Sequence, residues 1–140
     1  MKKYLHPDEI PFFVRGEGAP VLEIHRARIA FAICYELSVD EHLVEACQFG
    51  ANVYIPSAAK TRSDVDIAAE RLSGIAKKYS MTVLMSNCTG ECDGGECAGH
   101  TSAWDHRGRL LGRLNERDEG LLLVETCTQE ILARTEGVSA

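Results

Sequence analysis

The stretch Arg28-Ile-Ala-Phe-Ala-Ile-Cys34-Tyr35-Glu36-Leu37 decides the fold of this chain, because an apolar run ends in a cysteine and polar residues follow it at once. A buried strand rich in Ile, Ala and Phe fixes the backbone, and the residue just past it stands at the rim where α/β sheets bind ligands. Cys34 is therefore the first candidate for a nucleophile. Free cysteine is also among the most buried residue types, so a packing role at the end of a core strand is the alternative.

The segments next to this strand predict a hairpin and a helix. Residues 20–24 are also strand-like, and a short polar turn joins them to the strand at 28–33. After the cysteine, Ser38 is expected to cap a helix, with Glu41 completing a capping box and Gly50 ending it.

The rest of the chain alternates strands with helix. In chain order, we expect a strand at 52–56, a helix at 63–79, a strand at 81–85, a glycine-rich loop at 88–99, a hairpin made of 101–104 and 110–114, and a last strand at 120–125. Strands alternating with two amphipathic helices, followed by antiparallel strands, predict an α/β fold in which helices cover one face of a mixed sheet. One domain over residues 1–140 is expected for a chain of this length.

Charge and apolar run lengths limit the partners. The net charge is -6, and no basic cluster offers the face that phosphate groups require, so nucleic acid is not expected as a partner. No apolar run approaches the roughly 20 residues of a membrane helix, and the first residues do not resemble a signal peptide. A cytoplasmic protein without a membrane partner is the expectation, and its six cysteines are then expected to be reduced thiols.

Three of these cysteines have the residue types of a metal site. Cys88, Cys92, Cys97 and His100 form the pattern C-x3-C-x4-C-x2-H, and such residues bind tetrahedral zinc. The spacing is looser than that of paired C-x2-C motifs. A substrate-lining loop is therefore the preferred interpretation, with no metal and no cofactor, and a small zinc-binding protein is kept as an open alternative.

Several segments together resemble one enzyme family. They are Lys2 and Glu9 near the start, Cys34-Tyr-Glu36, Asn87-Cys-Thr-Gly-Glu-Cys-Asp93, and Gly99-His-Thr-Ser-Ala-Trp-Asp105 followed by Gly108. In order and spacing they resemble the nitrilase superfamily, the carbon-nitrogen hydrolases, from Lys2 to about Ile131. The resemblance covers the carboxyl-terminal half of such an enzyme. It implies half of a four-layer α-β-β-α sandwich, with an irregular opening segment at 1–18, sheet and helices at 19–131 and a tail at 132–140.

The resemblance also implies a Glu-Lys-Cys triad. Lys2 corresponds to the catalytic lysine, Glu9 to an assisting glutamate and Cys34 to the nucleophile, with Lys3 replacing Lys2 if the register slips by one. The triad glutamate lies upstream of the lysine in the family and has no counterpart in this sequence.

Four further residues complete the expected site. Tyr35, through its backbone N–H, is expected to bind the oxyanion together with Lys2, and Glu36, Ser57 and Ala58 are expected to line the substrate site. For Glu36, a structural hydrogen-bond role in the loop after Cys34 is the favoured alternative.

The expected reaction is hydrolysis of a non-peptide carbon-nitrogen bond through a cysteine thioester. The substrate would be a small polar amide, with a nitrile or a carbamoyl compound as alternatives, and no cofactor is required. Whether this chain is active alone is left open, and a non-catalytic remnant that serves as a binding module is the alternative. The expected partners are a second copy of the chain or a complementary amino-terminal chain that brings the missing glutamate.

Overall fold

A mixed six-stranded sheet forms the centre of the molecule. The computed structural model describes residues 2–17, 21–92 and 94–136. The strand order is β1-β2-β3-β4-β7-β8, in which β2, β3 and β4 are parallel and the other neighbours are antiparallel. The strands are β1 (Val21–Ile24), β2 (Ala27–Ile33), β3 (Val53–Ala58), β4 (Thr82–Asn87), β7 (Ser102–Trp104) and β8 (Leu110–Arg113).

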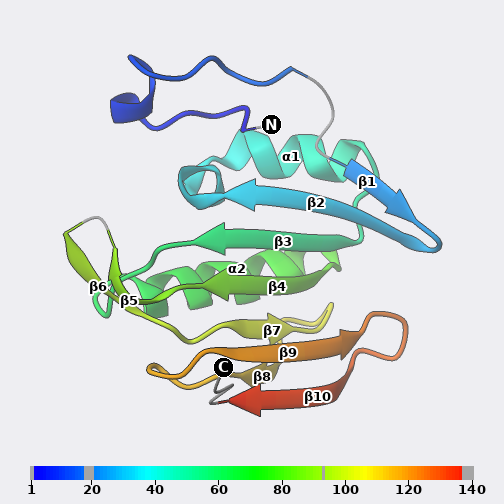
Figure 1. Cartoon of the computed structure of the whole chain (residues 1–140). Coiled ribbons are helices and arrows are strands. Elements are labelled where there is room, and N and C mark those ends of the chain that lie inside the picture. Colours follow the sequence, from blue (N-terminus) through cyan, green and yellow to red (C-terminus); the bar gives the residue numbers. More distant parts are fainter. Residues whose placement is uncertain (1, 18–20, 93, 137–140) are drawn as a thin grey trace.

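Two helices cover one face of this sheet, α1 (Asp40–Gln48) and α2 (Val65–Tyr79) (Figure 1). Small side chains on β2, Ala30 and Ala32, are fully buried beneath the helices, and they alternate with larger residues that point the other way. Leu72 of α2 and Tyr54 of β3 are among the largest side chains of the same core. The fold is therefore the α/β fold that the sequence predicts, with one layer of helices and one of sheet.

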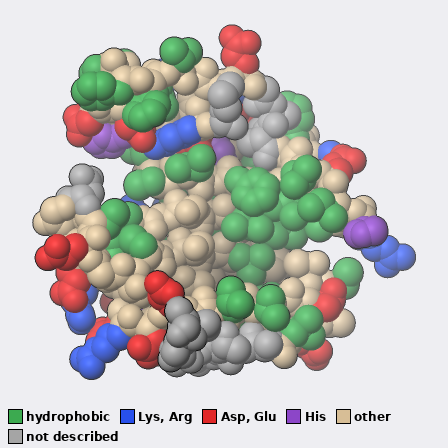
Figure 2. Space-filling view, in the orientation of Figure 1, with side chains coloured by type: hydrophobic (Ala, Val, Ile, Leu, Met, Phe, Trp, Pro, Cys, Tyr) green, Lys and Arg blue, Asp and Glu red, His purple; other side chains and the backbone are tan. Residues whose placement is uncertain are grey.

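The opposite face of the sheet carries exposed apolar side chains. Cross-strand pairing places Leu22 and Ile24 of β1 on the same face as Phe31 and Ile33 of β2, and these four side chains are 45–48% exposed. We call this set the open face. Figure 2 shows hydrophobic side chains gathered on this side of the molecule.

Two hairpins flank the main sheet. The first pairs β5 (Thr89–Cys92) with β6 (Gly95–Ala98), and the second pairs β9 (Gly120–Glu125) with β10 (Glu130–Glu136). The second hairpin packs over β8, where the glycine backbone at Gly112 lies against the side chains of Leu122 and Ile131. Among the described residues, no helix combines the length and the apolar character needed to cross a membrane.

Most predicted elements are confirmed. The hairpin before Cys34 forms between β1 and β2, although Pro20 lies outside the described residues. The helix predicted at 63–79 is α2, and the hairpin predicted at 101–114 is β7–β8.

The predicted start of the first helix is wrong. Residues Cys34–Ser38 form a 3-10 helix, η2, and α1 begins only at Asp40, with Val39 at the N-cap and no side-chain cap. The backbone N–H of Val39 donates to the carbonyl of Glu36, which closes the 3-10 turn and places Ser38 inside it. Ser38 therefore cannot act as the cap.

Two further predictions are corrected. The glycine-rich loop at 88–99 is the β5–β6 hairpin, because Gly94, at φ 76°, allows a tight turn between two short paired strands. The strand at 120–125 is not the last, since β10 pairs with it and extends through residues predicted to be tail. Residues 137–140 of that tail lie outside the described residues, and the opening segment contains only one short 3-10 helix, η1 (Pro7–Glu9), within residues 2–17.

Candidate active site

The carboxyl ends of β2, β3 and β4 meet at one edge of the sheet, which we call the strand-end edge. The parallel register aligns Ile33 with Ser57 and Ser57 with Ser86. Residues that follow these positions are therefore neighbours in space although they lie far apart in the sequence. Cys34 is the first residue after β2, and Asn87 is the last residue of β4.

Cys34 occupies a strained backbone conformation at this edge. Its φ is 49°, in the left-handed region that non-glycine residues rarely adopt, and its side chain is exposed. Such conformations cost roughly 1–3 kcal/mol and persist where the surrounding structure holds them. The turn places a thiol at the open end of a rigid strand.

Glu36 holds this turn in place. Its Oε2 atom accepts a hydrogen bond from the backbone N–H of Ile33 at 2.9 Å. Its Oε1 atom accepts from the backbone N–H groups of Lys3 at 2.6 Å and Tyr4 at 3.1 Å. The side chain is 3% exposed, so the geometry supports the structural alternative for Glu36 over direct contact with substrate.

His42 of α1 lies behind Glu36. Its Nε2 atom is 4.0 Å from Glu36 Oε2, and its Nδ1 atom is 3.3 Å from the hydroxyl of Tyr54. Burial lowers the pKa of His42 from its usual value, although the Glu36 carboxylate acts in the opposite direction. The ring thus packs as part of the core beneath the cysteine turn.

Lys2 forms an ion pair with Glu9. The Nζ atom lies 2.7 Å from Oε1 and 2.6 Å from Oε2, and only 13% of the lysine side chain is exposed. Glu9 Oε2 also accepts from the backbone N–H of His6 at 2.6 Å. The Lys2 ammonium, followed by this backbone N–H, lowers the pKa of Glu9. Lysine and glutamate are therefore held together in one fixed arrangement.

Lys3 points elsewhere. Its Nζ atom lies 2.6 Å from Oε1 of Glu45 on α1, and the hydroxyl of Tyr4 donates to the same oxygen at 3.1 Å. The Glu45 carboxylate raises the pKa of Lys3, whose side chain is partly exposed. The two candidate lysines thus have different partners, and only Lys2 pairs with Glu9.

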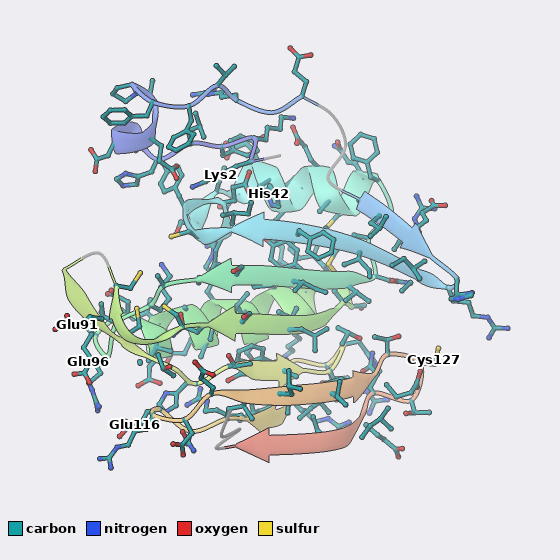
Figure 3. The ribbon with its side chains drawn as sticks, in the orientation of Figure 1. Lys2, His42, Glu91, Glu96, Glu116 and Cys127 are labelled. Atoms are coloured by element: carbon teal, nitrogen blue, oxygen red, sulfur yellow. The ribbon has the colours of Figure 1, made fainter. Side chains whose placement is uncertain are left out.

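The opening segment packs directly on η2. Lys3 contacts Glu36 through its backbone, and the ring of His6 packs edge-on against Tyr35 with ring centroids 5.1 Å apart. Lys2 directly precedes Lys3 in the chain, and Figure 3 labels it in the opening segment, close to His42 in the view. The segment with the Lys2–Glu9 pair is therefore fastened to the turn that carries Cys34.

The other predicted residues differ in access. Ser57 is exposed at the strand-end edge, whereas the side chain of Ala58 is buried and points into the core. Tyr35 is half-buried against His6. Ser57 can therefore offer its side chain at the strand-end edge, whereas Ala58 can contribute only its backbone there.

Sequence reasoning did not single out Asn87. Its Oδ1 atom accepts from the N–H of Lys60 at 2.7 Å, and its Nδ2 atom donates to the carbonyls of Lys60 at 3.1 Å and Gly99 at 2.7 Å. The Thr101 hydroxyl contacts both the N–H and the carbonyl of Asn87. The signal available in the sequence was the single amide side chain of Asn87 at the end of an apolar strand. Asn87 lines a cavity of about 310 Å³ together with Ser86, Cys88 and His100.

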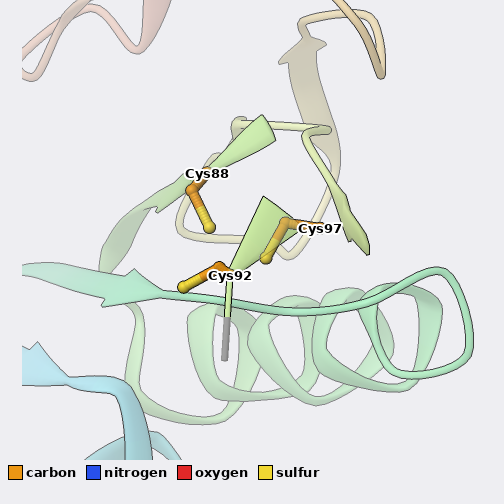
Figure 4. Close-up of side chains that lie close together, drawn as sticks. All are labelled: Cys88, Cys92 and Cys97. Carbon is orange, nitrogen blue, oxygen red and sulfur yellow. The ribbon is translucent and has the colours of Figure 1, made fainter. Parts of the chain in front are cut away.

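The structure brings three of the four predicted zinc ligands together. The Sγ atoms of Cys88, Cys92 and Cys97 all lie within 4.8 Å of one another (Figure 4). Burial, reinforced by the thiol of Cys88, raises the pKa of Cys97 to about 12. His100 is outside this group, and its Nδ1 atom is buried without a hydrogen-bond partner in the part of the chain that the structure describes.

Comparison with known proteins identifies the family of this chain. The chain matches the carbon-nitrogen hydrolase family over residues 3–133. This chain belongs to the carbon-nitrogen hydrolase family. It is 29% identical over 123 residues to the 2-oxoglutaramate amidase of Bacillus subtilis (strain 168), an alignment that covers 88% of this chain and 47% of the relative.

Solved carbon-nitrogen hydrolases share the fold. An amidase from Nesterenkonia sp. AN1, solved after Michael addition of acrylamide at its active-site cysteine, superposes with a TM-score of 0.70 at 25% identity, over 83% of this chain and 46% of that one. Nit3 of Saccharomyces cerevisiae, a member of the nitrilase superfamily, gives a TM-score of 0.73 at 18% identity and covers 84% and 44%. The chain therefore spans less than half the length of these relatives, and Lys2 lies one residue before the matched range.

Proposed function

We propose that this carbon-nitrogen hydrolase chain carries the nucleophile of an amidase and that Cys34 is that nucleophile. The observation that supports this is the position of Cys34 in a strained, exposed turn at the strand-end edge, fastened through Glu36 to the segment of the Lys2–Glu9 pair. Nucleophilic residues are commonly presented by such turns, whose geometry the neighbouring elements enforce.

The reaction follows from the residue types. The Cys34 sulfur attacks the carbonyl carbon of an amide, the carbon-nitrogen bond breaks, and the nitrogen leaves after it gains a proton. Water then attacks the resulting thioester, which yields the carboxylic acid and restores the thiol. The Lys2 ammonium and the backbone N–H of Tyr35 stabilise the oxyanion, and Glu9 positions Lys2.

The relatives support a small amide as the substrate. One relative is named for 2-oxoglutaramate, and the Nesterenkonia amidase has been solved with acrylamide and with the acetamide moiety of fluoroacetamide on its active-site cysteine. Ser57 provides a small, exposed polar group at the strand-end edge of this chain, which fits compact polar substrates.

A further acid-base group is proposed to complete the catalytic centre. Proton transfer to the leaving nitrogen requires an acid-base group, which contributes about 10² to 10⁴ in rate, and in the family this group is a glutamate upstream of the lysine. We infer that the open face, formed by Leu22, Ile24, Phe31 and Ile33, is covered by a complementary chain in the active enzyme and by a second copy when the chain is isolated. A cytoplasmic location stays a prediction.

The test is the rate at which iodoacetamide alkylates each cysteine from pH 5 to 9, read by peptide mass spectrometry. We expect Cys34 to react at least about tenfold faster than Cys127, which is also exposed, because a nucleophile in an assembled site is activated by the groups around it. Lys2→Met should remove this advantage. Equal rates for Cys34 and Cys127, or a rate that Lys2→Met leaves unchanged, would contradict the proposal.

A second measurement addresses turnover. Ammonia release from acrylamide and butyramide should be abolished by Cys34→Ala in any preparation that shows activity. Release that survives this substitution would assign the chemistry to another group.

A further inference from the structure

The β5–β6 hairpin places three sulfur atoms on one side of a small, firmly held element. Cys97 faces Gly90 in the hairpin register, and Cys88 and Cys92 lie two residues to either side of that glycine. Because Gly90 has no side chain, nothing is interposed between the three cysteines along the strand. A Cβ atom built at Gly90 would meet no heavy atom within 4 Å.

The hairpin is held from two sides. Cys97 forms an isolated antiparallel bridge with Thr61, and the N–H of Ala98 donates to the carbonyl of Lys60 at 2.9 Å. The N–H of Gly99 donates to the carbonyl of Cys88 at 2.9 Å. The backbone positions of Cys88 and Cys97 are therefore fixed before any ligand binds, which reduces the conformational entropy lost on binding.

The spacing of the sulfur atoms suits a metal ion. Zn²⁺ bound to thiolates has Zn–S distances of about 2.3 Å, so the sulfurs of a tetrahedral site lie about 3.8 Å apart. The observed limit of 4.8 Å is within a small side-chain rotation of that value. A disulfide would need only two sulfurs, whereas here three converge.

Access and charge also fit a cation. Cys97 is buried, Cys88 is half-buried and Cys92 is exposed, so the cluster opens to solvent on one side. Glu91 and Glu96 pair across the same hairpin and are exposed, and their side chains alternate with those of the cysteines along the strands. They supply negative charge nearby. Among the described residues, only the three thiols lie close enough together to share a metal ion.

We propose that Cys88, Cys92 and Cys97 form a binding site for a thiophilic metal ion of the Zn²⁺ type. Each thiol gives its proton to solvent, three metal-sulfur bonds form, and the fourth coordination position is open to water or another small ligand. The sequence analysis preferred a loop without metal, and the convergence of the three sulfurs is the observation that favours the other alternative. The site does not depend on the assignment of Cys34.

The experiment is a titration of the metal-free, reduced chain with Zn²⁺ under argon, in competition with a chromophoric chelator, and with Co²⁺ as a spectroscopic probe. We expect one ion per chain and a thiolate-to-cobalt charge-transfer absorption band. Cys92→Ser is the test variant, because Cys92 is exposed and its loss should leave the fold intact. Removal of a group that only hydrogen-bonds to a metal ligand typically weakens metal binding by about 10- to 100-fold. Removal of a ligand itself should weaken Zn²⁺ binding at least as much.

Two variants serve as controls. Cys127→Ser removes an exposed thiol distant from the hairpin (Figure 3), and Cys34→Ala removes the candidate nucleophile, and both should bind one ion as the unmodified chain does. Zn²⁺ should also raise the melting temperature of the unmodified chain and of both controls, but not of Cys92→Ser. Absence of binding by the unmodified chain, equal binding by Cys92→Ser, or loss of binding in Cys34→Ala alone would overturn the proposal.

Discussion

At the scale of single residues, Cys34 and Glu36 have opposite effects on the same turn. The left-handed conformation of Cys34 costs roughly 1–3 kcal/mol. The carboxylate of Glu36 accepts three backbone hydrogen bonds, and a hydrogen bond to a charged group contributes about 1.5–3 kcal/mol. The hydrogen bonds therefore outweigh the strain, so a buried carboxylate holds the thiol in an exposed position.

Glu36→Gln tests this balance. The amide keeps the shape of the side chain but replaces one acceptor oxygen by an NH₂ group that faces backbone donors. We expect a loss of about 2–4 kcal/mol in the free energy of unfolding, measured by urea denaturation. Glu70→Gln, on the exposed side of α2, is the matched control and should change stability by less than about 0.5 kcal/mol. An equal effect of the two substitutions would show that Glu36 does not hold the turn.

At the scale of elements, α2 is fixed to the turn between β7 and β8. The Ser73 hydroxyl donates to the carbonyl of Gly108 at 2.7 Å. Gly108 has a φ of 78°, and a Cβ atom there would lie 2.6 Å from the carbonyl oxygen of Ser73. This close approach requires glycine, because both the conformation and the space exclude a side chain. Asp105 stabilises the same turn by accepting from the backbone N–H groups of Arg107 and Arg109.

Two glycine-to-alanine substitutions should have opposite effects on stability. Gly108→Ala should destabilise the chain by at least about 2 kcal/mol, through strain and contact with α2. Gly74→Ala lies on the exposed side of α2, where a Cβ atom meets nothing within 4 Å, and should stabilise by about 0.5–1 kcal/mol because alanine favours helix. Urea denaturation of both variants measures the difference, and the same sign for both would contradict the packing described for Gly108.

The sequence predicted those helices and strands that are determined by residues close together in the chain. The apolar run before Cys34 and the helical spacing of α2 carry their own periodicity, and both elements form as predicted. Ser38 failed as a cap because Glu36 closes a 3-10 turn through it. The β5–β6 hairpin was missed because its glycines resemble a loop, while its bridge to Thr61 depends on residues more than 30 positions away.

In the candidate site, too, features set by neighbouring residues were predictable and features set by distant residues were not. The place of Cys34 at a strand end was readable from the sequence, and so was a structural alternative for Glu36. The contacts of Asn87 with Lys60 and Gly99 were not readable, because they arise only when β3, β4 and the hairpin are assembled. The convergence of three cysteines without His100 likewise depends on the register of the hairpin.

At the scale of the whole molecule, helices cover one side of the sheet along β1 and β2, whereas the open face lies on the other side of these two strands. The helices bury Ala30 and Ala32, while Phe31 and Ile33 on the other side of the same strand are 45% and 46% exposed. Burying one large apolar side chain contributes about 1.5–3 kcal/mol, so a face with four of them favours association.

Phe31→Lys should weaken self-association of the isolated chain. The substitution removes apolar area and places a charge at the centre of the open face, so the dissociation constant should rise by at least about tenfold in sedimentation velocity experiments. Ile67→Lys is the control, because Ile67 is 68% exposed on the helical side and should leave the sedimentation unchanged. An unmodified chain that sediments as a monomer at every concentration would contradict the inference about the open face.

The side chain of Asn87 has a thermodynamic consequence of its own. One amide is hydrogen-bonded to the segment after β3 and to the end of the hairpin that carries the cysteines, and it also borders the cavity at the strand-end edge. A ligand in this cavity and an ion at the hairpin would thus act on a shared group. If the ion changes the affinity of the cavity for its ligand by some factor, linkage requires the ligand to change the affinity for the ion by the same factor.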